Sequence, residues 1–206
     1  LRIIYYFDFD SFPARKNPEA AICAFKKAFP QDEEVTLTVK VRGDRDLGRR
    51  QWLMKEAAAD RRIMIVDKTL SRTEMHRMLM EHDVFLSLHR SEGFGLGCAE
   101  ALAAGKAVVA TNYGGSADFI THETGFPVQW QPVSVEKEDY VFAENATWAD
   151  PSIDHAAHLL REIYENPIIA AERAREGFRI LTKKHSSDAV GRKIVKILRE
   201  RGVLTI

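Results

Sequence analysis

The feature that most constrains the fold is a strand–loop–helix–strand unit at residues 83–111. Its outer parts, residues 84–86 and 107–110, are short continuous apolar runs, which are typical of strands buried in a parallel sheet. Between them a glycine-rich loop leads into a helix of small residues. A helix start that lacks side chains presents free amides and the positive end of the helix dipole, and this favours an anion such as phosphate.

Two carboxylates flank these amides, Glu92 in the loop and Glu100 about a turn into the helix. Carboxylates repel a bare phosphate but accept hydrogen bonds from the hydroxyls of a sugar or a ribose. Amides for phosphate beside carboxylates for hydroxyls therefore predict a nucleotide-sugar site. Besides the two glutamates, its predicted members are Gly93, Phe94, Gly95, Leu96 and Gly97.

With seven residues between them, Glu92 and Glu100 resemble the E-x7-E motif of retaining glycosyltransferases of family 4, within the glycosyl transferases group 1. Residues 99–111 resemble the helix and strand that follow this motif in the family. The resemblance implies that Glu92 holds donor-sugar hydroxyls near the reacting carbon and that Glu100 binds the ribose hydroxyls. Nothing in the sequence supports Glu92 as a covalent nucleophile.

Arg15 and Lys16 lie in the loop at 10–18, after a strand predicted at 2–9. In an open parallel sheet this edge is where ligands bind. In the resembling family a lysine followed by Gly or Asn holds the donor diphosphate, and Lys16 with Asn17 matches that pattern. Ser11 stands where the family usually has an arginine, so Arg15 is the candidate to supply the missing charge.

Two further loops follow predicted strands at the same edge of the sheet. By resemblance, the loop after the strand at 63–66 lies against the nucleoside base, and its candidate contacts are Val66, Asp67, Lys68 and Leu70. After the strand at 107–110, Gly114 and Gly115 form a turn that either approaches the donor closely or is a simple tight turn.

Strands and helices alternate from residue 2, which predicts an α/β fold with a doubly wound, mostly parallel sheet and extra C-terminal helices. We expect one nucleotide-sugar-binding domain over 1–206, the Rossmann-like half of a GT-B fold. The aromatic-rich stretch 129–148, with Trp130, Tyr140, Phe142 and Trp148, is expected to carry a hairpin or a substrate-side loop. Residues 150–206 are predicted to be helical, and by resemblance the N-terminal acceptor domain is missing.

Composition excludes several classes of function. The 30 basic and 30 acidic residues cancel, so net charge gives no argument for nucleic acid. Cys23 and Cys98 lie in apolar helix-like stretches and predict buried thiols in a reducing compartment, the cytoplasm. Peripheral association of the full-length protein with the inner face of the membrane is a further expectation. The histidines form no metal-ligand pattern, so neither a metal nor another cofactor is expected. For His89, which lies close to the predicted site, we expect a structural role.

The sequence as a whole predicts the donor-binding half of a retaining glycosyltransferase. It would move a sugar from a nucleoside diphosphate sugar to a saccharide or glycoconjugate acceptor. Lys16, Arg15 and the loop amides would stabilise the departing diphosphate without a metal. The isolated chain is expected to transfer sugar poorly or not at all. A sugar-nucleotide epimerase of the same architecture and a non-catalytic scaffold domain remain as alternatives.

Overall fold

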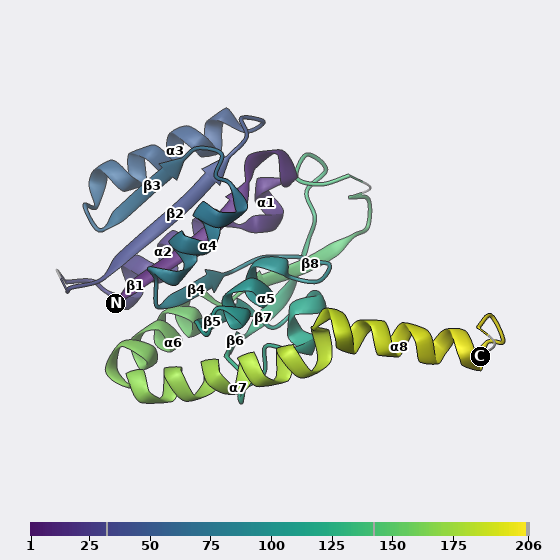
Figure 1. The fold of residues 1–206 in the computed structure, drawn as a ribbon. Helices are drawn as coiled ribbons and strands as arrows, with labels where there is room; N and C mark the ends of the chain where they lie inside the picture. Colours follow the sequence, from purple (N-terminus) through teal and green to yellow (C-terminus); the bar gives the residue numbers. More distant parts are fainter. Residues whose placement is uncertain (32, 142, 205–206) are drawn as a thin grey trace.

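The computed structural model describes residues 1–31, 33–141 and 143–204. Its centre is a parallel sheet of six strands in the order β3-β2-β1-β4-β5-β6 (Figure 1). The strands are β1 (Arg2–Asp8), β2 (Thr36–Arg42), β3 (Ile63–Asp67), β4 (Val84–Ser87), β5 (Ala107–Thr111) and β6 (Phe126–Val128). The strand order reverses between the neighbouring strands β1 and β4: β1 to β3 run outward to one edge of the sheet, and β4 to β6 run outward to the other. This is the doubly wound α/β fold that the alternation of strands and helices predicts.

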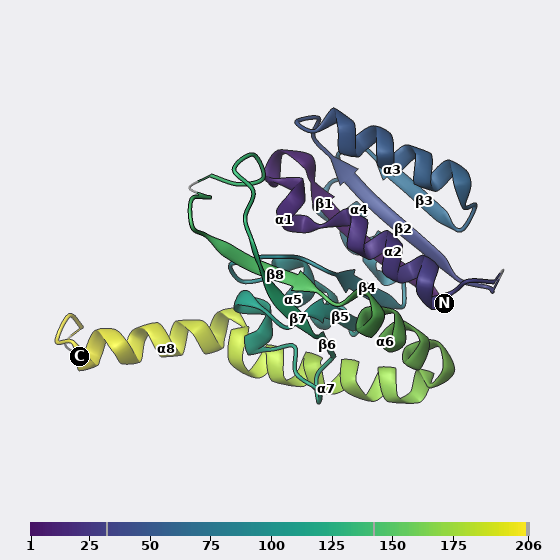
Figure 2. The same cartoon turned by 180° about the vertical axis from the view of Figure 1, so that it is seen from behind.

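Helices cover both faces of the sheet. Helices α2 (Pro18–Ala28), α3 (Leu47–Ala59) and α6 (Ile153–Glu165) cover one face (Figure 2). They contribute to the larger apolar core. The second core lies on the other face, where α4 (Arg72–Met80) and α5 (Leu96–Ala103) pack with the end of α7 (Pro167–His185). Alternation along the strands separates the two cores. Ile3 and Tyr5 of β1 face the first core, whereas Ile4 and Tyr6 face the second.

The segment after β1 is more ordered than the predicted loop at 10–18. It forms a 3₁₀ turn at Phe9–Ser11 and a short helix α1 (Pro13–Lys16) before α2 begins. Pro13 fixes the first position of α1, and Asn17 ends α1 in the left-handed conformation with φ of 57°. The side chain of Asn17 then caps α2 by accepting from the amide of Ala20. The result is a rigid turn that carries Arg15 and Lys16.

The stretch at 129–148 forms the predicted hairpin. Strand β7 (Trp130–Ser134) pairs antiparallel with β8 (Thr147–Pro151), so the helical part begins at Ile153 rather than at 150. Phe142 lies outside the described residues. Cys98 is buried as expected, but Cys23 is exposed, because it lies on the face of α2 opposite the core residues Ala21, Ile22 and Phe25.

Helix α8 (Ser187–Glu200) follows α7 and projects away from the body of the molecule (Figures 1 and 2). None of its residues is buried. This element agrees with the helical structure that the sequence predicts for the C-terminal part of the chain. Across residues 1–31, 33–141 and 143–204, no helix combines the length and the apolar composition needed to cross a bilayer.

Candidate functional site

A cavity of about 630 Å³ opens at the carboxyl edge of the sheet, where β1, β2 and β4 end. Its walls include Lys16, Glu92 and Glu100, together with the start of α5 at Gly95, Leu96 and Gly97. In doubly wound sheets ligands bind at this edge, beside the pair of strands where the chain reverses direction. The fold therefore brings together, in one hollow, Lys16 and Glu100, which are 84 positions apart in the sequence.

The glycine loop shapes one wall of the cavity. Gly95 stands before α5 with φ of 82°, and no side chain caps the first amides of the helix. At Gly97, an added Cβ would lie 2.8 Å from the ring of Phe85 and 3.2 Å from that of Tyr6. A side chain there would fill the hollow, so glycine keeps the helix N-terminus open to it. Amides at such a helix start are suited to a phosphate.

Lys16 and Glu92 form an ion pair across the cavity wall, from α1 to the loop after β4. Arg15 adds a second cation 3.3 Å from the Glu92 carboxylate. Burial acts to raise the pKa of the Glu92 carboxyl, but Lys16 and then Arg15 outweigh burial and lower its pKa below the ordinary value. Glu92 is thus an anion that is held at a fixed position and able to accept hydrogen bonds.

Arg15 contacts the loop of Glu92 from outside the cavity lining. Its guanidinium donates to the carbonyl oxygen of Ser91 at 2.8 Å and to the hydroxyl of Ser11 at 2.9 Å. The positive charge therefore reaches the position of Ser11, the residue that departs from the family pattern. Among the described residues that line the cavity, Arg15 is not present. In this structure it positions the Ser91–Glu92 backbone, and a direct contact with phosphate stays a prediction.

Glu100 lies next to Tyr6 of β1, whose hydroxyl donates to the Glu100 carboxylate at 2.9 Å. Burial, followed by the charge of Glu100, raises the pKa of the Tyr6 hydroxyl, so Tyr6 remains a donor. The exposed Glu100 has lone pairs left to accept from a ligand. Tyr6 was not predicted as a site residue. The available signal was a side chain with a polar hydroxyl at a position of β1 that faces the core.

The remaining predicted members are only partly gathered around the cavity. Leu70 lines it, whereas Val66, Asp67, Lys68, Gly93 and Phe94 lie outside the lining that the described residues form. Asp67 is ion-paired with Arg50, and Phe94 packs on Phe119 at 5.2 Å between ring centroids. The lining also includes residues that were not predicted from the sequence, among them Lys40, Arg42, Arg72 and Met75.

Gly114 and Gly115 pack against the backbone of the Glu92 loop. Gly114 has φ of 72°, and a Cβ there would collide with the carbonyl oxygen of Glu92. A Cβ on Gly115 would collide with the carbonyl of Gly93. The amide of Gly115 also donates to the Glu92 carbonyl at 3.2 Å. The glycines thus permit a close approach, but the partner seen here is the loop that carries Glu92.

His89 has a structural role in this geometry. It is buried, and its Nε2 lies 3.1 Å from the carbonyl oxygen of Tyr113, which can only accept. Nε2 therefore carries the hydrogen, and Nδ1 accepts from the Ser87 hydroxyl at 3.0 Å. Burial lowers the pKa of the imidazole, with partial compensation from the Tyr113 carbonyl. The folded state holds His89 neutral.

The pKa of His89 predicts a loss of stability in mild acid. The unfolded chain takes up a proton at this histidine below about pH 6.5, whereas the folded chain resists it to a lower pH. The free energy of unfolding should therefore decrease as the pH is lowered through that window, by up to ~1.4 kcal/mol per pH unit for this group. Urea titrations between about pH 7 and about pH 5 should show a smaller slope for His89→Gln than for the exposed control His122→Gln. Equal slopes would contradict the buried neutral state.

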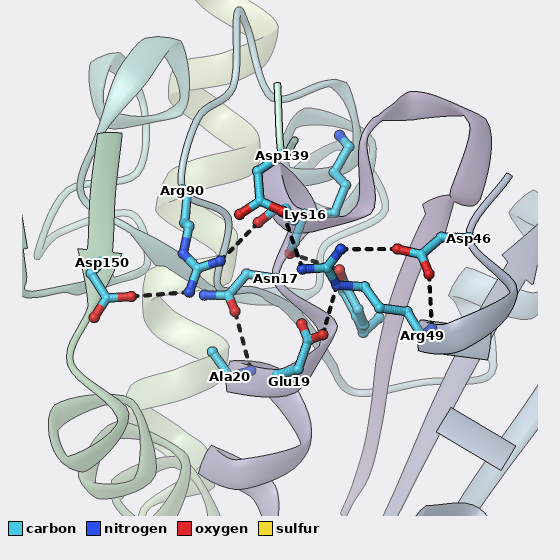
Figure 3. Close-up of polar contacts among 11 residues, drawn as sticks. Lys16, Asn17, Glu19, Ala20, Asp46, Arg49, Arg90, Asp139 and Asp150 are labelled. Atoms are coloured by element: carbon cyan, nitrogen blue, oxygen red, sulfur yellow. Dashed lines mark hydrogen bonds and ion pairs between the residues drawn. The ribbon is translucent and has the colours of Figure 1, made fainter. Parts of the chain in front are cut away.

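A second polar cluster supports the Lys16 turn from outside the cavity (Figure 3). Arg90 donates to the carbonyl oxygen of Ala14 at 3.2 Å and to Asp150 of β8 at 3.4 Å. Arg49 joins Glu19 at the start of α2 to Asp46 and to Asp139 of the hairpin connection. The hairpin is thereby tied to both sides of the turn, which restricts its movement.

Known proteins resemble this chain in sequence family and in fold. The family model described as glycosyl transferases group 1 matches residues 8–180. The C-terminal domain of a glycosyl transferase group 1 family protein (LpcC) from Francisella tularensis superposes with a TM-score of 0.71 at 21% identity, over 90% of this chain and 87% of that chain. No curated protein sequence gives a significant match to the chain.

Two longer proteins share the fold. Anabaena HepE (Alr3699), solved in complex with UDP, has a TM-score of 0.75 at 16% identity over 97% of this chain and 48% of its own. Sucrose-phosphate synthase (tll1590) from Thermosynechococcus elongatus has a TM-score of 0.74 at 20% identity over 99% of this chain and 46% of its own. The chain spans about half the length of each. At such identities the likeness shows the fold, that of a GT-B C-terminal domain.

Proposed function

The chain belongs to the glycosyl transferases group 1 family, and we propose that it forms the donor-binding half of a retaining enzyme of family 4 type. The enzyme moves a sugar from a nucleoside diphosphate sugar to a saccharide or glycoconjugate acceptor. The observation that carries the proposal is the cavity itself, whose lining includes Lys16, the N-terminus of α5 and the carboxylates of Glu92 and Glu100. These groups match the diphosphate, the sugar and the ribose of such a donor.

The donor diphosphate lies between Lys16 and the amides at the start of α5. Negative charge develops on this group as the bond to the sugar breaks, and a fixed cation with oriented amides stabilises it. Glu92 accepts from the sugar hydroxyls, and Glu100 from the ribose hydroxyls. Among the residues that the structure describes, no three His, Cys, Asp or Glu side chains are placed to hold a metal ion together, and the absence of a metal requirement stays a prediction.

The rest of the enzyme is proposed from the size of the relatives. Because the chain spans about half of HepE and of sucrose-phosphate synthase, an N-terminal domain would supply the acceptor site. HepE structures in complex with UDP and with UDP-glucose support a uridine-type donor for the shared fold. Both cysteines are free thiols, which favours a reducing compartment such as the cytoplasm. A product of inverted anomeric configuration, determined by NMR on the longer enzyme, would contradict retention.

Glu100→Ala should weaken the binding of nucleoside diphosphate to the chain by at least ~1 kcal/mol, because the charged acceptor for the ribose hydroxyls is lost. Calorimetric titration with UDP, GDP, ADP and dTDP measures the effect. Glu172→Ala, an exposed glutamate on α7, is the matched control and should bind as the unaltered chain does. Unchanged affinity in Glu100→Ala would contradict the placement of the ribose.

A further inference from the structure

Lys40 is a buried lysine that lines the cavity. It lies near the end of β2, with only 6% of its surface exposed. Alternation along β2 places it on the same side of the sheet as Thr38, which bonds His82, and Arg42, which bonds Asp8. Within residues 1–31, 33–141 and 143–204, the side chain of Lys40 has no hydrogen-bond or ion-pair partner, although its backbone is paired in the sheet. Lysines buried to this extent are usually paired. Because Lys40 is unpaired and lines the cavity, its ammonium is free to bind a ligand there.

The carboxylates near Lys40 are already engaged. Asp8 accepts from Nε of Arg42 at 2.6 Å, and Asp67 is ion-paired with Arg50. Burial, and then the charge of Arg42, lower the pKa of the Lys40 ammonium, whereas Asp8 and Asp67 act in the opposite direction. The surroundings therefore supply positive charge and hydrogen-bond donors, and the acceptor must come from the ligand.

The order of strands indicates which part of the donor reaches Lys40. The cavity runs from β4, which precedes Glu92, across β1, which precedes Lys16, to β2. Each strand adds about 4.8 Å along this edge. With the diphosphate at Lys16 and the ribose at Glu100, the next group outward is the base. Leu70 and Met75 offer apolar surface to the faces of a base at this end.

We propose that Lys40 determines the base specificity of the donor site, by donating to the carbonyl oxygen at position 4 of a pyrimidine or position 6 of a purine. The inference rests on the proposed function. An ammonium has three donors and no acceptor, so it pairs with a carbonyl but faces an exocyclic amino group donor to donor. The site then favours uracil, thymine and guanine over cytosine and adenine.

UDP and CDP provide the sharpest test, because they differ only at position 4 and at the adjoining ring nitrogen. In titrations of the chain, UDP should bind about tenfold or more tightly than CDP. Lys40→Met keeps the length of the side chain and should bring the ratio close to one by weakening UDP alone. Lys40→Gln, which both donates and accepts, should retain UDP binding and improve CDP binding. IDP and ADP repeat the comparison for purines.

The exposed Lys55→Met of α3 is the matched control and should leave the ratio unchanged. Equal affinities for UDP and CDP in the unaltered chain, or a preference that persists in Lys40→Met, would overturn the role of Lys40. In either case the proposed function stands if both nucleotides bind and Glu100→Ala weakens them. Failure of every nucleotide to bind is the separate result that contradicts the proposed function.

Discussion

Lys16→Met is expected to weaken nucleoside diphosphate binding roughly 100-fold, the upper part of the range for hydrogen bonds to charged groups. Two effects add. The substitution removes the ammonium that faces the cavity, and it leaves the Glu92 carboxylate with less compensation beside the site of the diphosphate. Titration calorimetry with UDP measures the change, and urea unfolding shows whether the variant is folded.

Two further variants make this prediction specific. Glu92→Gln should tighten the binding of UDP, because Lys16 no longer shares its charge with a carboxylate. Lys26→Met removes a similar ion pair, with Glu56, away from the cavity and should not change UDP affinity. If Lys16→Met bound UDP as tightly as the unaltered chain, the diphosphate would not lie beside Lys16.

Gly114→Ala is expected to lower the free energy of unfolding by about 3 kcal/mol. Part of this cost is the left-handed backbone, since φ is 72° at this position. The rest is the collision of the new methyl group with the carbonyl oxygen of Glu92. The loop must move to relieve it, so UDP affinity should fall together with stability.

Gly105→Ala separates the two contributions. Gly105 has φ of 69°, and nothing lies within 4 Å of its added Cβ. It should therefore cost only about 1 kcal/mol in urea unfolding and leave UDP binding intact. Equal losses of stability in the two variants would show that contact between the turn and the Glu92 loop does not matter.

Local patterns made much of the fold predictable. Apolar runs predict the central strands, and the spacing of Ser71 and Glu74 is typical of the capping box whose two hydrogen bonds form at the start of α4. Such features depend on a few neighbouring residues. The same holds for Glu92 and Glu100, whose spacing fixes their places on the loop and on α5.

The site contained features that no local pattern could supply. Tyr6 meets Glu100 and Arg15 reaches Ser91 only because β1 and β4 are neighbours in the sheet. The contact of Gly114 with the Glu92 loop also depends on the tertiary fold. For Lys40 a signal was available, the alternation of Thr38, Lys40 and Arg42 along one strand. The predicted burial of Cys23 is wrong, because an apolar stretch does not reveal which face of a helix a residue occupies.

Titration of the unaltered chain with UDP, GDP, ADP and dTDP tests the central claim most directly. We expect saturable binding of one molecule per chain at the cavity of Lys16, Glu92 and Glu100, with a preference for the nucleotides whose bases carry the carbonyl. The absence of binding by any of these nucleotides at millimolar concentration would contradict a donor site in this chain.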